Sequence, residues 1–264
     1  MEYKRIVVKV GTSTLTHSTG RLHIERLDKL ARVLSDLKNG GREVLLVTSG
    51  AIGAGAAALN FEKPDTVSGK QAAAAVGQCR LMHIYDKLFA EYGHTVAQIL
   101  VARHDLTVPD RGGLLLDTLQ TLLSWRTVPV VNENDAVSHA EIAPGQNGHA
   151  TFGDNDTLSA LIAALVKADL LVLLTDIDGF YTADPRENPD ARRIKRVTDV
   201  TDKMRLASGG AGTARGTGGM ITKLAAAEIA LENGFPMAVA HGKDPAVLYE
   251  ILRGGDVGTL FARS

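Results

Sequence analysis

Residues 170–175 have the sequence LLVLLT, five large aliphatic residues followed by one threonine. Six residues is a suitable length for one β-strand. Because apolar side chains would point to both faces of this strand, other elements must cover both faces of its sheet. A central strand of a parallel sheet between two helix layers meets that requirement. Other short apolar runs, each separated from the next by a longer segment, are residues 5–10, 43–47, 96–101, 128–131 and 237–241. The sequence therefore predicts an α/β fold, a three-layer αβα sandwich with a mostly parallel central sheet.

Helical periodicity fills the intervals between these strands. The predicted helices are residues 24–37, an alanine-rich helix from residue 50, and residues 68–92, 114–125, 155–166, 223–232 and 245–252. Two loop-like stretches, Asp176–Arg192 and the glycine-rich Ser208–Gly219, lie inside this alternating pattern. Because neither separates two different patterns, we expect one domain over residues 1–264.

The composition is that of an ordinary globular protein of 264 residues, 45% hydrophobic and 22% charged. The net charge of −1 argues against a nucleic-acid partner or an anionic membrane surface. The longest apolar stretch, Ala160–Thr175, is short and is interrupted by Lys167 and Asp169, and the N-terminus does not resemble a signal peptide. Cys79 is the single cysteine, so we expect a packed side chain rather than a disulfide or thiolate metal site. These features favour a cytoplasmic protein without a membrane partner, and no metal-ligand spacing stands out among its histidines.

Polar residues follow the first two predicted strands. Lys9 lies near the end of an apolar strand and precedes Gly11, and a buried lysine costs desolvation unless it meets an anion. Ser49 and Gly50 lie where the next strand turns into a helix, whose free N–H groups favour anions. A solvated lysine and a simple helix cap are the plainer interpretations. Since parallel strands bring their carboxyl ends to one edge, we expect an anion site there.

Two acidic motifs follow later strands. In NENDAV, residues 132–137, Asp135 could bind a substrate ammonium group, although a turn of Asn and Asp would have the same composition. In GDND, residues 153–156, an acidic residue that faces the carboxyl edge of the sheet could hold Lys9 and a second lysine in place, although acidic residues also suit the first turn of any helix.

The motif GTGGMITK, residues 216–223, has the chemistry of a phosphate-binding loop. Glycines let the backbone approach phosphate groups, and Lys223 lies about one turn into the following helix. It differs from a Walker A loop, because Leu224 follows the lysine and the spacing is different. A flexible linker is the alternative interpretation.

The segment TDIDG, residues 175–179, allows a different chemistry. An apolar strand followed by Asp-x-Asp is how phosphatases of the haloacid dehalogenase type present an aspartyl nucleophile, which would be Asp176 with Asp178 as acid and base. The motif lies past the middle of the chain, and Phe180 stands where such enzymes usually have threonine. An aspartyl-phosphate phosphatase therefore remains the alternative enzyme.

Taken together, the motifs resemble those of the amino-acid kinase family, and especially of its glutamate-phosphorylating members. The matching stretches, which cover essentially the whole chain, are VVKVGTS (7–13), VTSGAIGAG (47–55), QAAAAVGQ (71–78), NENDAV, GDND, LLTDIDGFYTADPR (173–186) and GTGGMITK. The resemblance implies the αβα fold and ATP-dependent phosphorylation of the γ-carboxylate of L-glutamate, the first step of proline biosynthesis. It also implies Mg²⁺ with ATP, a homo-oligomer (dimer or tetramer), and proline as a feedback inhibitor.

The resemblance also implies roles for individual residues. Lys9 and Lys223 match the lysines that neutralise the transferring phosphoryl group, and Asp156 matches the residue that organises them. The positions that match glutamate-binding residues are Ser49, Asp135 and Asn155. The positions that match ATP-binding residues are Thr175, Asp176, Thr217, Gly218, Gly219, Met220, Ile221, Thr222 and Lys223.

The chain departs from the family pattern in three places. It stops at Ser264, where many members continue into an RNA-binding-type module. Asp110–Leu116 lacks expected polar residues, and Gly145–Phe152 resembles an insertion near the substrate side. A kinase for another small acid and a catalytically silent amino-acid sensor are further alternatives, but retention of Lys9 and Lys223 argues against the silent sensor.

Overall fold

A computed structural model describes residues 3–17, 19–61, 64–102, 105–106, 108–137, 154–183, 188–208 and 219–263. Its main sheet has eight strands in the order β3-β4-β2-β1-β5-β9-β10-β8. In chain order these strands are β1 (Arg5–Val10), β2 (Glu43–Val47), β3 (Val96–Val101), β4 (Val128–Glu133), β5 (Leu170–Thr175), β8 (Arg196–Val197), β9 (Met237–His241) and β10 (Thr259–Phe261). All neighbours from β3 to β9 are parallel, and β10 runs antiparallel to β9. The predicted α/β fold with a mostly parallel sheet is confirmed.

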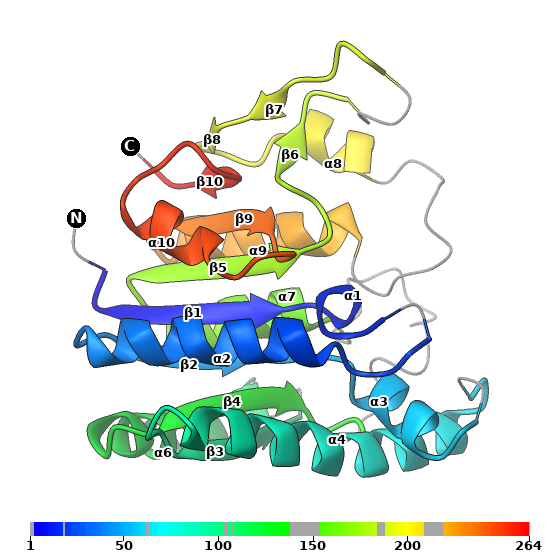
Figure 1. The fold of residues 1–264 in the computed structure, drawn as a ribbon. Helices are drawn as coiled ribbons and strands as arrows, with labels where there is room; N and C mark the ends of the chain where they lie inside the picture. Colours follow the sequence, from blue (N-terminus) through cyan, green and yellow to red (C-terminus); the bar gives the residue numbers. More distant parts are fainter. Residues whose placement is uncertain are drawn as a thin grey trace.

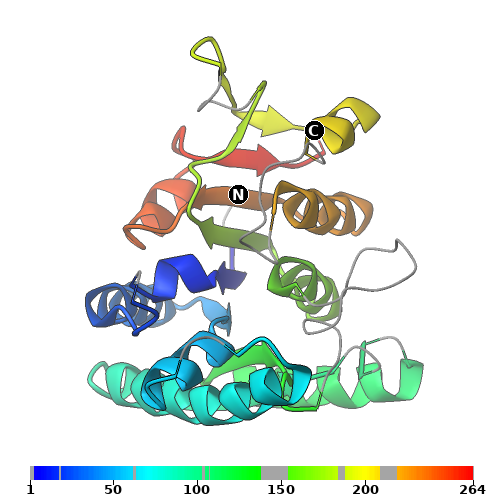
Figure 2. The same ribbon diagram turned by 90° about the vertical axis from the view of Figure 1, so that its right-hand side faces the viewer.

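Helices cover both faces of this sheet (Figures 1 and 2). Alternate residues of β1 show why: Ile6 and Val8 pack into one core and Val7 into the other. On the first face lie α1 (Thr12–Leu15), α2 (Ile24–Asn39), α3 (Ala51–Ala58), α4 (Val67–Ala90) and α10 (Val247–Leu252). On the second face lie α6 (Pro109–Ser124), α7 (Asn155–Leu165) and α9 (Met220–Glu232), with α8 (Asp202–Ser208) beside α9.

Strands β1, β4, β5 and β9 point to the right in Figure 1, so Figure 2 looks onto the edge where their carboxyl ends meet. The helices α3, α7 and α9 start near this edge. The topology thus gathers strand ends and helix N-termini in one place, as an α/β sheet does.

The close crossing of α3 and α4 explains Gly55 of the VTSGAIGAG segment and Gly77 of α4. A Cβ atom on Gly55 would collide with the carbonyl of Ala73, and one on Gly77 with the carbonyl of Ala51. Only glycine lets the two backbones approach this closely. Gly55 and Gly77 therefore serve the packing of α3 against α4.

Several short elements lie outside the sequence prediction. The hairpin β6 (Phe180–Tyr181) and β7 (Arg193–Ile194) forms within the stretch expected to be a loop and just beyond it. Helix α6 starts at Pro109, where a proline suits the first turn, rather than at Leu114.

The expectation for Cys79 is wrong, because this side chain is exposed on α4. In the described part of the chain, no helix is both long and apolar enough to cross a bilayer.

Candidate active site

One carboxylate, that of Asp156, joins the two lysines that the sequence singles out. Its Oδ1 lies 2.6 Å from Lys9 Nζ and its Oδ2 lies 3.1 Å from Lys223 Nζ. Asp156 is in the first turn of α7, Lys9 is in β1, and Lys223 is one turn into α9. All three are buried, with residue exposures of 0%, 6% and 4% in that order. The sequence-derived hypothesis of a carboxylate between two lysines therefore agrees with the geometry.

Two aspartates of the same motif have opposite electrostatic behaviour. Burial opposes ionisation of Asp156, but the charges of Lys9 and Lys223 together outweigh it and lower the pKa of this carboxyl. Asp154, the N-cap of α7, lies two residues earlier. Burial, together with the negative charge of Asp156, raises the pKa of Asp154 to about 6. Asp156 is thus the carboxyl that the two lysines keep ionised, whereas burial and the Asp156 charge oppose ionisation of Asp154.

This difference predicts a pH-dependent stability. Asp154 holds its proton more tightly in the folded chain than unfolded, so its contribution favours folding at low pH and is lost as pH rises from about 4 to 6. Above that range the shift from 3.8 to about 6 costs up to about 3 kcal/mol. We expect Asp154→Asn, which keeps a good N-cap, to raise the free energy of unfolding at pH 7 and to flatten this pH dependence. Urea titrations from pH 4 to 8 measure both effects, and an unchanged pH slope would contradict the assignment.

The predicted glutamate-binding residues Ser49 and Asn155 lie together beside the lysine cluster. The Asn155 side-chain amide is 3.0 Å from Ser49 Oγ and 2.9 Å from the Thr48 carbonyl. Both residues are buried, and Ser49 comes directly before the first turn of α3. Asp135, also buried, lies in the turn after β4 and lines a cavity of about 470 Å³ together with Gln78 of α4. Ser49, Asp135 and Asn155 therefore lie around the carboxyl ends of β2 and β4, at the same edge of the sheet.

The predicted ATP-binding residues lie on the β5 and α9 side. Thr175 ends β5 and donates its hydroxyl to Asp176 Oδ1 at 2.9 Å, and Asp176 is exposed. Gly219 is the N-cap of α9, and the Thr222 hydroxyl lies 2.7 Å from its carbonyl and 3.0 Å from Asp156 Oδ2. In the same first turn, Met220 is half-buried and Ile221 is exposed. Thr217 and Gly218 fall outside the described residues.

The aspartates of the phosphatase alternative are not arranged as a nucleophile and an acid. Both Asp178 carboxylate oxygens accept from the Tyr181 hydroxyl, at 3.0 and 2.9 Å. Asp176 accepts from its neighbour Thr175 instead.

Sequence reasoning gave no role to Gln78 or Thr48. Gln78 is buried on α4, and its amide oxygen accepts from Asn132 Nδ2 at 2.9 Å. The Thr48 hydroxyl lies 2.7 Å from the hydroxyl of the fully buried Tyr85. A polar residue in an alanine-rich helix, as in QAAAAVGQ, was the only available signal for Gln78.

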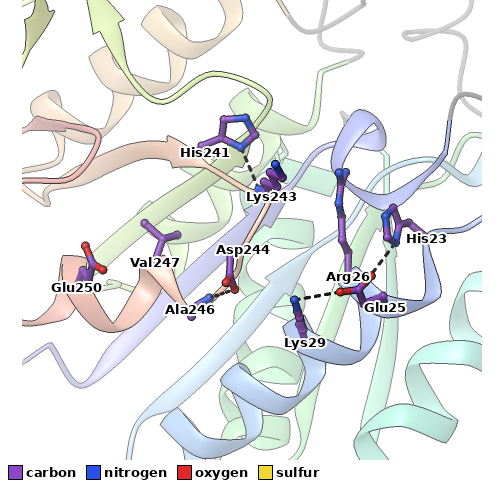
Figure 3. Close-up of a pocket in the computed structure, with 10 residues that line it drawn as sticks. All are labelled: His23, Glu25, Arg26, Lys29, His241, Lys243, Asp244, Ala246, Val247 and Glu250. Carbon is purple, nitrogen blue, oxygen red and sulfur yellow. Dashed lines mark hydrogen bonds and ion pairs between the residues drawn. The ribbon is translucent and has the colours of Figure 1, made fainter.

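A second cavity, of about 500 Å³, lies away from these residues, between the N-terminal turns of α2 and the start of α10 (Figure 3). Acidic and basic side chains line this cavity, and several of them form ion pairs with one another or hydrogen bonds to the backbone. Lys29 pairs with Glu25 at 3.1 Å, and the Arg26 guanidinium donates to the carbonyls of Ser13 and Thr14. None of the predicted site residues lines this cavity.

Comparisons with known proteins agree with this geometry. Residues 4–241 match the model of the "Amino acid kinase family". A glutamate 5-kinase of Clostridium perfringens is 52% identical over 259 residues, covering 98% of this chain and 95% of that protein. A glutamate 5-kinase of Symbiobacterium thermophilum is 52% identical over 261 residues, covering 98% and 96%. The chain also matches 67% of a glutamate 5-kinase of Caldanaerobacter subterraneus, at 51% identity.

Among solved structures, the UMP kinase of Bacillus anthracis superimposes with a TM-score of 0.63 at 17% identity. It covers 99% of this chain, and 97% of the UMP kinase chain is matched. The UMP kinase of Ureaplasma parvum gives a TM-score of 0.64 at 14% identity, with both chains matched completely. These structures support the fold, and at such identities they support only the fold.

Proposed function

The chain belongs to the amino acid kinase family, and on that premise we propose that it transfers the γ-phosphoryl group of ATP to the γ-carboxylate of L-glutamate. The product is γ-glutamyl phosphate, and the reaction is the first step of proline biosynthesis. Relatives about half identical over nearly the whole chain carry the name of this activity. The structural observation that carries the proposal is the buried Asp156 carboxylate that holds two lysines at the ligand edge of the sheet.

The reaction requires positioning and charge neutralisation more than covalent help from the protein. A γ-carboxylate oxygen of glutamate forms a bond to the γ-phosphorus while the bond from that phosphorus to the β–γ bridging oxygen breaks, and ADP leaves with the electron pair. Both reactants are anions and repel each other. At an effective dielectric constant of about 20, one ammonium group about 4 Å away offsets roughly 4 kcal/mol of this repulsion.

We propose that Lys9 and Lys223 supply these ammonium groups and that Asp156 fixes their separation. The Asp156 carboxylate contacts both lysines at once, so neither can turn away without losing an ion pair in a dry site. A held charge needs no reorganisation when the phosphoryl group moves between oxygens. In this role Asp156 is a positioning residue and the lysines act on the reacting atoms.

We propose that glutamate binds beside Ser49, Asp135 and Asn155. The carboxylate of Asp135 suits the α-ammonium group, while the Ser49 hydroxyl and the Asn155 amide suit the ammonium and carboxylate groups of the amino acid. In this proposal the γ-carboxylate extends toward the lysine cluster, and the adjacent positions of Asn155 and Asp156 in the first turn of α7 support that orientation. The cavity beside Asp135 gives this end of the site its volume.

We propose that ATP binds over the ends of β5 and α9, with Thr175, Asp176 and residues 217–223 around it. The N-terminal turn of α9 offers backbone N–H groups to phosphate oxygens. Mg²⁺ would enter with the nucleotide, held by phosphate and water oxygens, because both oxygens of Asp156 are taken by lysines. Within the described residues, no cluster of three acidic, histidine or cysteine side chains is arranged around a metal position.

Four earlier expectations are further proposals. We propose one catalytic domain over the whole chain, a cytoplasmic location, a homo-oligomer, and inhibition by proline. Sedimentation with and without proline, together with a proline titration of the activity, tests the last two.

Replacing Asp135 should weaken glutamate binding selectively. Loss of one charged hydrogen bond in a dry site costs about 1.5–3 kcal/mol, so Asp135→Ala should raise the glutamate KM roughly 10- to 150-fold. The ATP KM should change little because the ammonium partner belongs to glutamate. Initial rates over a grid of both substrates give the two constants. Equal increases in both would show that the turn is only structural.

One assay tests the function itself. The purified chain is incubated with ATP and a panel of amino acids, and hydroxylamine traps any acyl phosphate while ADP release is measured. Glutamate-dependent hydroxamate supports the proposal, and its absence rejects it. Acid quench after incubation with γ-labelled ATP excludes the phosphatase alternative if no label stays on the protein. A stoichiometric label that is lost in Asp176→Asn would instead favour that alternative.

A further inference from the structure

Four amide side chains form a row that leads from the proposed glutamate site to the surface. Asn155 Nδ2 donates to Asn132 Oδ1 at 3.0 Å, and Asn132 Nδ2 donates to Gln78 Oε1 at 2.9 Å. Gln78 Nε2 donates to Gln98 Oε1 at 3.4 Å. The members of this amide row come from α7, β4, α4 and β3, so the row joins four elements of the fold.

Every bond in the amide row has the same direction, from a nitrogen to the next oxygen outward. Two backbone groups set this direction. The Thr48 carbonyl, 2.9 Å from Asn155 Nδ2, can only accept, and the Glu133 N–H, 3.0 Å from Asn132 Oδ1, can only donate. Each amide has its oxygen opposite its nitrogen, so the orientation of one member determines the orientation of the next.

The inner end of the row is an acceptor without a bond. With Nδ2 committed to the Thr48 carbonyl and Asn132, the Asn155 Oδ1 atom is buried, and it has no hydrogen-bond partner in the part of the chain that the structure describes. Asn155 itself is 5% exposed. A buried acceptor of this kind calls for a donor from a ligand, and an ammonium group supplies three.

We propose that Gln78 is a positioning residue for glutamate: it holds Asn132, which in turn keeps the Asn155 Oδ1 atom toward the substrate's ammonium group. This inference rests on the proposed function. Gln78 is suited to this role because its amide oxygen accepts from Asn132 and its amide nitrogen donates to Gln98. It is 7% exposed and follows Gly77, at the tight crossing of α3 and α4.

Without the Gln78 oxygen, Asn132 Nδ2 would be a buried donor with no acceptor. Turning the Asn132 amide over would satisfy it only by breaking the bonds to Glu133 and Asn155. Either outcome disturbs Asn155. Gln98, by contrast, is exposed, so water can replace it at the outer end of the row.

The test is a comparison of substitutions with nearly the same shape. Gln78→Met removes the acceptor, and it should raise the glutamate KM about tenfold, with the ATP KM and kcat changed less than about twofold. Gln78→Glu keeps an oxygen for Asn132 and should return the glutamate KM to within about threefold of the unsubstituted value.

A control separates positioning from loss of stability. Leu81 is fully buried on the same helix, and Leu81→Ala should lower the melting temperature without raising the glutamate KM. An unchanged KM in Gln78→Met, or an equal rise in Leu81→Ala, would overturn the inference while leaving the kinase function intact. Failure of the unsubstituted chain to phosphorylate glutamate would reject the proposed function, and this inference with it.

Discussion

Lys223→Ala is expected to lower kcat by roughly 10²- to 10³-fold, the loss typical of one removed transition-state donor. The reason is the position of Lys223 in the first turn of α9, where Asp156 holds its ammonium group in a buried site. The glutamate KM should change much less, since the proposed glutamate contacts come from other residues. Steady-state rates at saturating ATP and glutamate measure the effect.

Lys9→Ala should be about as damaging as Lys223→Ala, because Asp156 holds both lysines in the same way. The matched control is Lys243→Ala. Lys243 is an exposed lysine in the loop after β9 and lines the other cavity. Its loss should leave kcat within about twofold, as is usual for surface substitutions. Unchanged turnover in Lys223→Ala, or an equal loss in Lys243→Ala, would remove the lysine pair from the mechanism.

The sheet could be predicted from sequence because its central strands are apolar on both faces. The sequence LLVLLT of β5 is typical of a strand that is buried on both faces. Strands β1, β2, β3 and β9 also have the predicted bounds. The strands β8 and β10 have only two and three residues, too few to show any periodicity. They form because the chain packs β10 beside β9 and β8 beside β10, a tertiary effect that local sequence does not carry.

Helix α4 shows the limit of the method for the site. Its alanine and glycine residues have little contrast between faces, although Ala73 and Ala74 are buried while Ala72 and Ala75 are exposed. For the same reason the burial of Gln78 could not be predicted. The lysine cluster was easier, because a lysine in an apolar strand and an acidic residue in a first turn both call for partners.

Neighbouring aspartates in one motif should respond to the same substitution with opposite signs. Asp154→Asn is expected to stabilise the fold at neutral pH, because Asp154 is buried and repelled by Asp156. Asp156→Asn is expected to destabilise the fold by about 3–5 kcal/mol, because it leaves Lys9 and Lys223 buried without their counter-charge. Chemical denaturation of the two variants at pH 7 gives the comparison directly.

Asp156→Asn should also separate binding from turnover. Its kcat should fall roughly 10³-fold, at least as far as in either lysine variant, because both ammonium groups lose their fixed position. Nucleotide binding should not weaken in the same way, since two lysines without a carboxylate attract phosphate more strongly. ADP should therefore raise the melting temperature of Asp156→Asn by more than it raises that of the unsubstituted chain, because a ligand that binds only the folded state stabilises it by mass action. Equal ADP-induced shifts combined with normal kcat would mean that Asp156 does not organise the lysines, whereas a larger shift with lost turnover would mean that its role is to hold them for phosphoryl transfer.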